Sequence, residues 1–246
     1  MRPATEETMR DDPAPCPDRP AASGADPHAA ARVVHSGPAL ANADAAAILV
    51  HGRGGTAEDI LELGRAIGTE GVAWLAPQAA GGAWYPFSFL APIESNEPWL
   101  SSSLAVLDRL VRRCGEAGLR PERVALLGFS QGACLAAEYA ARHARRYGGL
   151  VLLSGGLIGP PGSPREYAGS LAGTPAFLGC SDVDPHIPVA RVHETAGVLE
   201  RLGAEVDERI YPGLGHTVTP DEVENARRLL DGVRNDRGGI AGLRKM

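Results

Sequence analysis

The pentapeptide Gly-Phe-Ser-Gln-Gly at residues 128–132 constrains the fold of this chain more than any other stretch. An apolar run, 124–127, comes directly before it, and an alanine-rich run that favours a helix, 133–141, follows. Gly-x-Ser-x-Gly between a strand and a helix is typical of a sharp, strained turn that exposes a serine at the edge of a sheet. A Cβ at either glycine would collide with the strand or helix packed against the turn. The flanking runs therefore favour an elbow that presents Ser130 as a nucleophile over a Gly/Ser turn without chemistry.

Apolar runs of strand length alternate with helix-forming runs from residue 45 to residue 233. This alternation predicts an α/β fold, with a mostly parallel sheet covered by helices on both faces, in a single domain. We expect that domain to span residues 29–236. Residues 1–28 are rich in Pro, Ala, Asp and Arg without apolar periodicity, which predicts a disordered N-terminal tail. Residues 237–246 are expected to be a frayed C-terminal tail.

The charge, the apolar runs and the cysteines exclude several classes of protein. The net charge is -6 and no Lys/Arg stripe is available to neutralise phosphates, so a nucleic-acid binder is not expected. No apolar run approaches the ~18 residues of a membrane span. The four cysteines show neither Cys-x-x-Cys pairing nor zinc-ligand spacing, so no metal or cofactor is expected. Scattered cysteines and the lack of an apolar leader indicate a cytoplasmic protein.

Residues with catalytic chemistry follow three of the predicted strands. Ser130 follows one strand, Asp182 and Asp184 follow a later one, and His216 follows the last. Because the carboxyl ends of parallel strands meet at one edge of a sheet, these side chains should lie together. His216 can take the proton of Ser130 during attack, and an aspartate can fix the imidazole tautomer. The order Ser, Asp, His is that of an α/β-hydrolase triad.

The choice between the two aspartates depends on the proline at position 185. Proline restricts the residue before it to an extended conformation, which gives Asp184 a fixed platform. We therefore predict Asp184 as the triad acid. Asp182 is expected to bind backbone N–H groups of the turn instead.

An oxyanion hole needs two backbone N–H donors near the serine. The residue after the nucleophile, Gln131, supplies one in such folds. The loop His-Gly-Arg-Gly-Gly at 51–55 should supply the other, and we predict the N–H of Arg53. We expect His51 to shape this loop by a hydrogen bond rather than to act as a second base.

The segment 78–98 is the longest irregular stretch of the predicted domain, and irregular segments of this length are usually functional. It holds four of the twelve aromatic residues, and we predict that these four line the substrate site as an apolar wall or lid: Trp84, Tyr85, Phe87 and Phe89. The alternative is that these rings cap the core.

The chain resembles the phospholipase/carboxylesterase family of α/β-hydrolases, which includes acyl-protein thioesterases and small bacterial carboxylesterases. The resemblance covers about residues 31–233. It rests on His-Gly-x-Gly at 51–54, the elbow pentapeptide, Asp-x-Asp-Pro-x-x-Pro at 182–188 and Gly-x-Gly-His at 213–216. It implies an α/β-hydrolase fold, the triad Ser130, Asp184 and His216, and oxyanion donors at Arg53 and Gln131. The family often has an apolar residue where this chain has Arg53.

The expected function is that of a serine hydrolase that cleaves small-molecule carboxylic esters through an acyl-enzyme. The alternatives are a lysophospholipase or acyl thioesterase, and a dienelactone-type hydrolase of aromatic degradation. A non-catalytic binding module with the same fold is a further alternative. The sequence leaves the oligomeric state open, a homodimer included.

Overall fold

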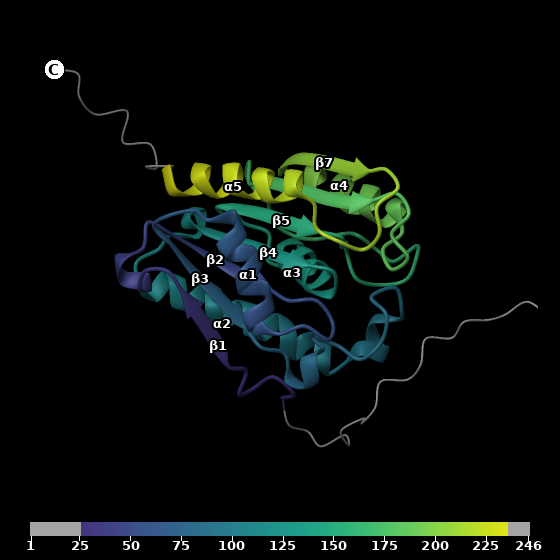
Figure 1. The fold of residues 1–246 in the computed structure, drawn as a ribbon. Coiled ribbons are helices and arrows are strands. Elements are labelled where there is room, and N and C mark those ends of the chain that lie inside the picture. Colours follow the sequence, from purple (N-terminus) through teal and green to yellow (C-terminus); the bar gives the residue numbers. More distant parts are fainter. Residues whose placement is uncertain (1–25, 236–246) are drawn as a thin grey trace, which may run out of the picture.

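A seven-stranded sheet forms the middle layer of the molecule, in the order β1-β3-β2-β4-β5-β6-β7 (Figure 1). The computed structural model describes residues 26–235. β1 runs antiparallel to β3, and the other neighbouring strands are parallel. The strands are β1 (Val33–Ser36), β2 (Ala45–Val50), β3 (Val72–Pro77), β4 (Val124–Phe129), β5 (Gly149–Leu153), β6 (Pro175–Ser181) and β7 (Glu205–Tyr211).

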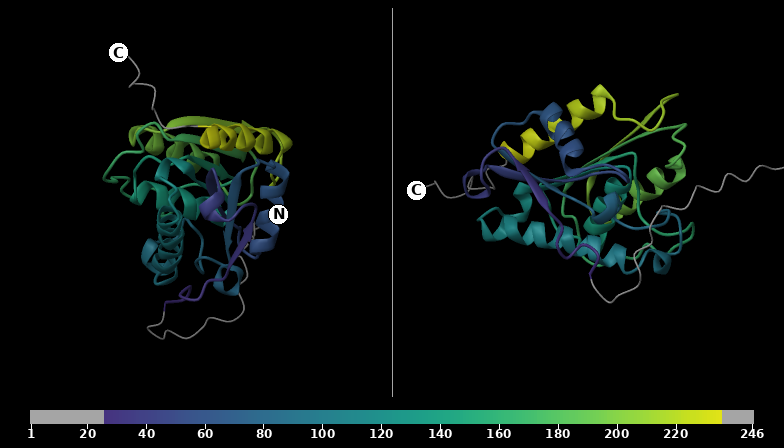
Figure 2. Two further views of the ribbon diagram at one scale, coloured as in Figure 1. Left: turned by 90° about the vertical axis from the view of Figure 1, so that its left-hand side faces the viewer. Right: turned by 60° about the horizontal axis from the view of Figure 1, so that its bottom comes forward.

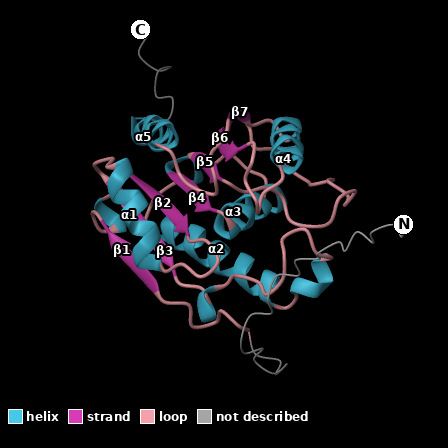
Figure 3. Cartoon of the chain, turned by 45° about the vertical axis from the view of Figure 1, so that its right-hand side comes forward, coloured by secondary structure: helices cyan, strands magenta, loops and turns pink. Residues whose placement is uncertain are grey.

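Helices cover both faces of the sheet (Figure 2, Figure 3). α1 and α5 pack on one face, and α2, α3 and α4 pack on the other. The helices are α1 (Ala57–Ile67), α2 (Trp99–Glu116), α3 (Gln131–Arg142), α4 (Val189–Arg201) and α5 (Pro220–Asn235). Short 3₁₀ turns occur at Leu40–Asn42, Ala80–Gly82, Ile93–Asn96 and Pro121–Arg123. The predicted single α/β domain with a mostly parallel sheet is confirmed.

Local sequence explains where these elements begin and end. The continuous apolar runs form β2, β3, β4 and β5, whose residues are buried on both faces apart from the half-buried Phe129 at the end of β4. Thr56 caps α1, because its side chain accepts from the N–H of Asp59 while the Asp59 carboxylate accepts from the N–H of Thr56. Pro220 stands at the first turn of α5, where its missing N–H costs nothing.

The ends of the chain bear on the predicted domain bounds. The predicted tails at 1–28 and 237–246 lie outside the described residues, except for 26–28. There the side chain of His28 is buried, between Trp84 and Trp99. Between residues 26 and 235, no helix is both long and apolar enough to cross a bilayer.

Candidate active site

The elbow between β4 and α3 carries Ser130 in a strained conformation, with φ 55° and ψ -122°. Its N–H donates to the carbonyl oxygen of Leu153 at 2.9 Å, which ties the turn to β5. A Cβ added at Gly132 would lie 2.0 Å from the carbonyl oxygen of Val50, and one at Gly128 would lie 2.4 Å from the Gly132 carbonyl. Both contacts are with backbone atoms that cannot move aside. The glycines therefore let β2, β4 and α3 approach closely enough to hold the serine at the sheet edge.

Asp184, from the loop after β6, and His216, from the loop after β7, form a hydrogen-bonded pair. The distance from His216 Nδ1 to Asp184 Oδ2 is 2.7 Å. The Asp184 side chain is fully buried, and its Oδ1 accepts the N–H groups of His186 and Ile187 at 2.8 and 3.1 Å. Burial raises the pKa of Asp184, but these hydrogen bonds and that of His216 outweigh burial and lower it overall. An ionised Asp184 holds the imidazole proton of His216 on Nδ1 and leaves Nε2 of His216 as an acceptor.

The His216 ring lies beside the elbow. Its centroid is 4.8 Å from that of Phe129, the residue directly before Ser130, and 4.9 Å from that of His186. The structure thus brings the predicted base and acid together and places the base next to the residue that precedes the predicted nucleophile.

Asp182 has a different partner from Asp184. Its Oδ1 accepts the N–H of Gly213 at 2.7 Å, and Ser181 Oγ donates to the Leu214 carbonyl oxygen. Gly213 has φ 71°, a left-handed conformation that glycine adopts without strain. Asp182 therefore ties the loop of Asp184 to the loop of His216.

The loop after β2 lies directly against the elbow. A Cβ at Gly52 would lie 3.3 Å from Ser130 Cβ, and the N–H of Gly54 donates to the Gly82 carbonyl oxygen at 2.8 Å. His51 Nδ1 donates to the Gly52 carbonyl oxygen at 2.7 Å, because its Nε2 accepts the N–H of Ala79 at 3.1 Å and must be unprotonated. His51 thus shapes the loop, as its position at the strand end suggests.

Three of the four predicted substrate-binding aromatics are buried. Trp84 and Tyr85 are fully buried, Phe89 is 7% exposed, and Phe87 is 54% exposed. Trp84 Nε1 donates to the carbonyl oxygen of His51 at 2.9 Å, so its ring supports the loop after β2. These rings cap the core, and a direct contact with substrate remains a proposal for Phe87.

Polar side chains that sequence reasoning missed hold the main chain of the aromatic segment. The Gln131 amide accepts the N–H of Trp84 and donates to the Tyr85 carbonyl oxygen, both at 2.9 Å. Asn96 Oδ1 accepts the N–H of Phe87 at 2.8 Å. Segment 84–87 is therefore a fixed wall rather than a lid. Gln131 and Asn96 are isolated polar residues outside any repeating pattern, so the sequence could not predict these contacts.

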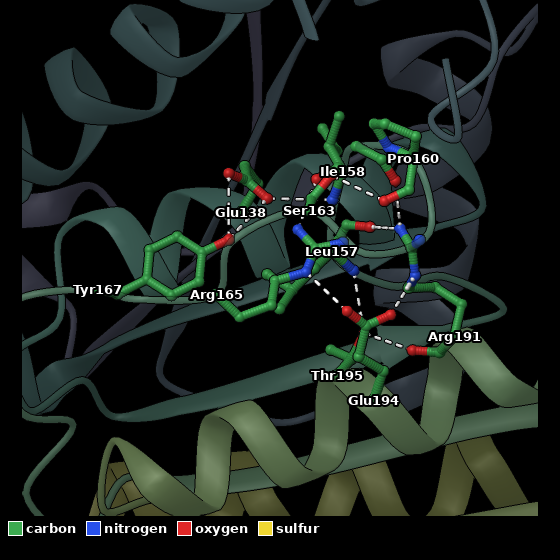
Figure 4. Close-up of polar contacts among 11 residues, drawn as sticks. Glu138, Leu157, Ile158, Pro160, Ser163, Arg165, Tyr167, Arg191, Glu194 and Thr195 are labelled. Atoms are coloured by element: carbon green, nitrogen blue, oxygen red, sulfur yellow. Dashed lines mark hydrogen bonds and ion pairs between the residues drawn. The ribbon is translucent and has the colours of Figure 1, made fainter. Parts of the chain in front are cut away.

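An ionic network of two buried arginines and a half-buried glutamate fixes the loop after β5 against α4 (Figure 4). Arg165 and Arg191 both contact the Glu194 carboxylate at 2.8 Å. Arg165 also donates to the Ile158 carbonyl oxygen at 2.6 Å, and Arg191 donates to that of Gly159 at 2.8 Å. The Arg191 guanidinium also lies 5.8 Å from the centre of the Phe89 ring. Sequence reasoning missed this network because Arg165 is 29 residues from Glu194 in the chain.

We expect acid to destabilise the fold through two buried histidines near Trp84. Burial lowers the pKa of His28 and His51 below the ordinary imidazole value of 6.5. The unfolded chain then binds protons that the folded chain does not, so the free energy of unfolding should fall as pH drops through about 6.5. Denaturant unfolding between pH 5 and 8 measures this slope. His51→Gln should reduce it, and equal slopes in the wild-type protein and the variant would contradict the prediction.

The similarity of this chain to known proteins agrees with the fold described above. The sequence model of the phospholipase/carboxylesterase family matches residues 31–233. The chain belongs to this family. A phospholipase/carboxylesterase from Dyadobacter fermentans superimposes with a TM-score of 0.79 at 40% identity, over 82% of this chain and 96% of that one. The carboxylesterase of Bacillus cereus, at 21% identity, shares the fold, with a TM-score of 0.64 over 83% of this chain and 95% of its own.

Acyl-protein thioesterase 1 of Saccharomyces cerevisiae is 30% identical over 133 residues, which are 52% of this chain and 58% of the yeast protein. The chain thus spans little more than half the length of curated relatives such as this one. The relatives are carboxylesterases and acyl-protein thioesterases, in agreement with the ester hydrolase expected from the sequence. Within residues 26–235, no group of three or more His, Cys, Asp or Glu side chains could hold a metal ion.

Proposed function

We propose that the protein is a serine hydrolase that cleaves carboxylic esters through an acyl-enzyme. The observation that carries the proposal is the 2.7 Å hydrogen bond between Asp184 and His216, beside an elbow that holds Ser130 at positive φ. In this proposal, Ser130 is the nucleophile, His216 is the general base and Asp184 orients the imidazole.

The reaction proceeds in two halves. Ser130 Oγ attacks the ester carbonyl while His216 Nε2 takes its proton, and the N–H groups of Arg53 and Gln131 stabilise the oxyanion. His216 then protonates the leaving alcohol, and the acyl group stays on Ser130. Water, activated by the same imidazole, attacks the acyl-enzyme and releases the acid.

The exposed apolar side chains favour small esters with short to medium acyl or aryl groups. Among the described residues, the exposed large hydrophobic side chains are Phe87, Val183 and Leu214. Each stands on a loop that follows a strand at the carboxyl edge of the sheet, the edge that carries Ser130. Exposed apolar side chains at this edge of the sheet suit an apolar substrate.

The cysteines support a cytoplasmic location. Cys114, Cys134 and Cys180 are free and buried. Burial raises the pKa of these thiols, to about 12 for Cys134, so they stay protonated and unreactive at neutral pH. Free thiols suit a reducing compartment. A small-molecule ester is the expected partner.

A fluorophosphonate probe followed by a substrate panel tests the proposal. We expect one adduct, on Ser130, and the highest kcat/KM for p-nitrophenyl esters of short or medium acyl chains, compared with matched thioesters and a lysophospholipid. A folded protein without an adduct would indicate a non-catalytic binding module. A preference for thioesters or lysophospholipid would indicate the activity that the thioesterase relatives suggest.

A further inference from the structure

Arg53 and Gln131, the two residues proposed as oxyanion donors, both hydrogen-bond through their side chains to the main chain of residues 84–87. The Arg53 guanidinium donates to the carbonyl oxygens of Tyr85 at 2.9 Å, Pro86 at 3.0 Å and Phe87 at 2.7 Å. The Gln131 amide donates to the same Tyr85 oxygen at 2.9 Å. The loop after β2 and the elbow after β4 are thereby joined through one carbonyl group.

The Arg53 side chain serves as a bridge between loops rather than as a surface charge. A guanidinium has five N–H groups, and main-chain carbonyls take up three of those of Arg53. No ion pair joins it to a carboxylate anywhere in residues 26–235. Hydrogen bonds from a charged donor are stronger than those between neutral groups, and three from one planar group fix its position and orientation.

The backbone of Arg53 stands between two glycines, which are held by hydrogen bonds from His51 to the Gly52 carbonyl oxygen and from the Gly54 N–H to the Gly82 carbonyl oxygen, and the Arg53 side chain adds a third link to the neighbouring segment. Gly52 precedes it and Gly54, with φ 76°, follows it, and glycine leaves the backbone free to adopt many conformations. The segment that the Arg53 side chain binds, residues 85–87, is itself held by the fixed residue before it. Trp84 is fully buried, its N–H is bound by Gln131, and its carbonyl oxygen accepts from His28 Nε2 at 3.0 Å.

We propose that the Arg53 side chain is a positioning residue for ester hydrolysis. By binding the carbonyls of residues 85–87, it holds its own backbone N–H at the separation from the Gln131 N–H that a tetrahedral oxyanion requires. The inference rests on the proposed function, because it deepens the account of the same oxyanion hole. Such donors act only when they are held in place before the reaction, and a displacement of about 1 Å costs about 10²-fold in rate.

The variant Arg53→Met tests this role, since it removes the donors and keeps an unbranched apolar stem. We expect kcat for p-nitrophenyl butyrate to fall about 10- to 100-fold, with KM within about twofold of wild type, because the oxyanion exists only in the transition state. Arg53→Lys keeps the charge but reaches fewer carbonyls, so its kcat should lie between those of wild type and Arg53→Met. Arg32→Met is the matched control: it removes another exposed arginine, paired with Glu58, and kcat should not change.

Two further measurements separate positioning from a general loss of structure. The affinity for a trifluoromethyl ketone, which forms an oxyanion on Ser130, should fall in parallel with kcat/KM. Added methylguanidinium should not restore the activity of Arg53→Ala, because a guanidinium that fills the site formed by the three carbonyls is not bonded to the backbone of residue 53; rescue would instead assign the effect to the carbonyl segment itself. If Arg53→Met does not fold, Arg53→Lys and Arg53→Ala provide the same comparison.

An unchanged kcat in folded Arg53→Met would overturn the inference. A rise in KM confined to esters that carry a negative charge would also overturn it, because the guanidinium would then bind substrate. Either result is compatible with a fluorophosphonate adduct on Ser130 in the wild-type protein. The absence of that adduct would instead remove the proposed function itself.

Discussion

Ser130→Ala should lower kcat for the best ester substrate by about 10⁶-fold, the loss typical of removing the nucleophile of a catalytic triad. Alanine has no oxygen to attack the carbonyl, and His216 then has no proton to transfer. The substitution keeps the Cβ, so the strain at φ 55° and the packing of β4 against α3 stay the same. We therefore expect the thermal unfolding midpoint to be unchanged. Hydrolysis is measured on the substrate panel.

Ser154→Ala is the matched control for this experiment. Ser154 also follows a strand, β5, and also has a positive φ, 48°, but its side chain is buried away from solvent. Its removal should leave kcat within a few-fold of wild type. Activity near the wild-type level in purified Ser130→Ala would assign the nucleophile elsewhere.

Asp184→Asn should lower kcat at neutral pH by about 10⁴-fold, the size of effect seen when a triad acid becomes an amide. The amide would donate an N–H to Nδ1 of His216, and the imidazole proton would move to Nε2, which can then no longer act as a base. The asparagine oxygen can still accept the N–H groups of His186 and Ile187. The loop should therefore keep its shape, and KM should change little.

Asp182→Asn separates the two aspartates. Its oxygen can still accept the N–H of Gly213, so the link between the two loops should survive and kcat should stay within about tenfold of wild type. Steady-state kinetics of both variants on one ester decide the question. A larger loss in Asp182→Asn than in Asp184→Asn would contradict the assignment of the acid.

The elements of the fold could be predicted because their signals are local. β2 is a run of apolar residues, and the elbow has its glycines two residues on either side of the serine. These patterns describe contacts between chain neighbours or with a sheet, whatever the rest of the sequence is. Placing Asp184 and His216 on loops at one edge required only the rule that parallel strands end together.

The fate of the aromatic segment could not be predicted from the same kind of pattern. Nothing in the residues around Trp84 and Tyr85 distinguishes a ring that lines a site from a ring that fills the core. Burial of both depends on partners distant in sequence, such as His28 and Gln131. Only the folded chain decides which aromatic, Phe87, faces solvent.

The sequence by itself determined the α/β class, the elbow and the order of the candidate catalytic residues, because periodicity and turn chemistry act over a few residues. Pro185 favoured Asp184 over Asp182, and the tertiary structure adds the hydrogen bond that joins Asp184 to His216. Only the tertiary structure decided that the Arg53 side chain reaches the carbonyls of 85–87. Each is a hydrogen bond between loops 32 residues apart in the chain. Such contacts follow from how the strands stack side by side, which brings distant loops to one edge of the sheet.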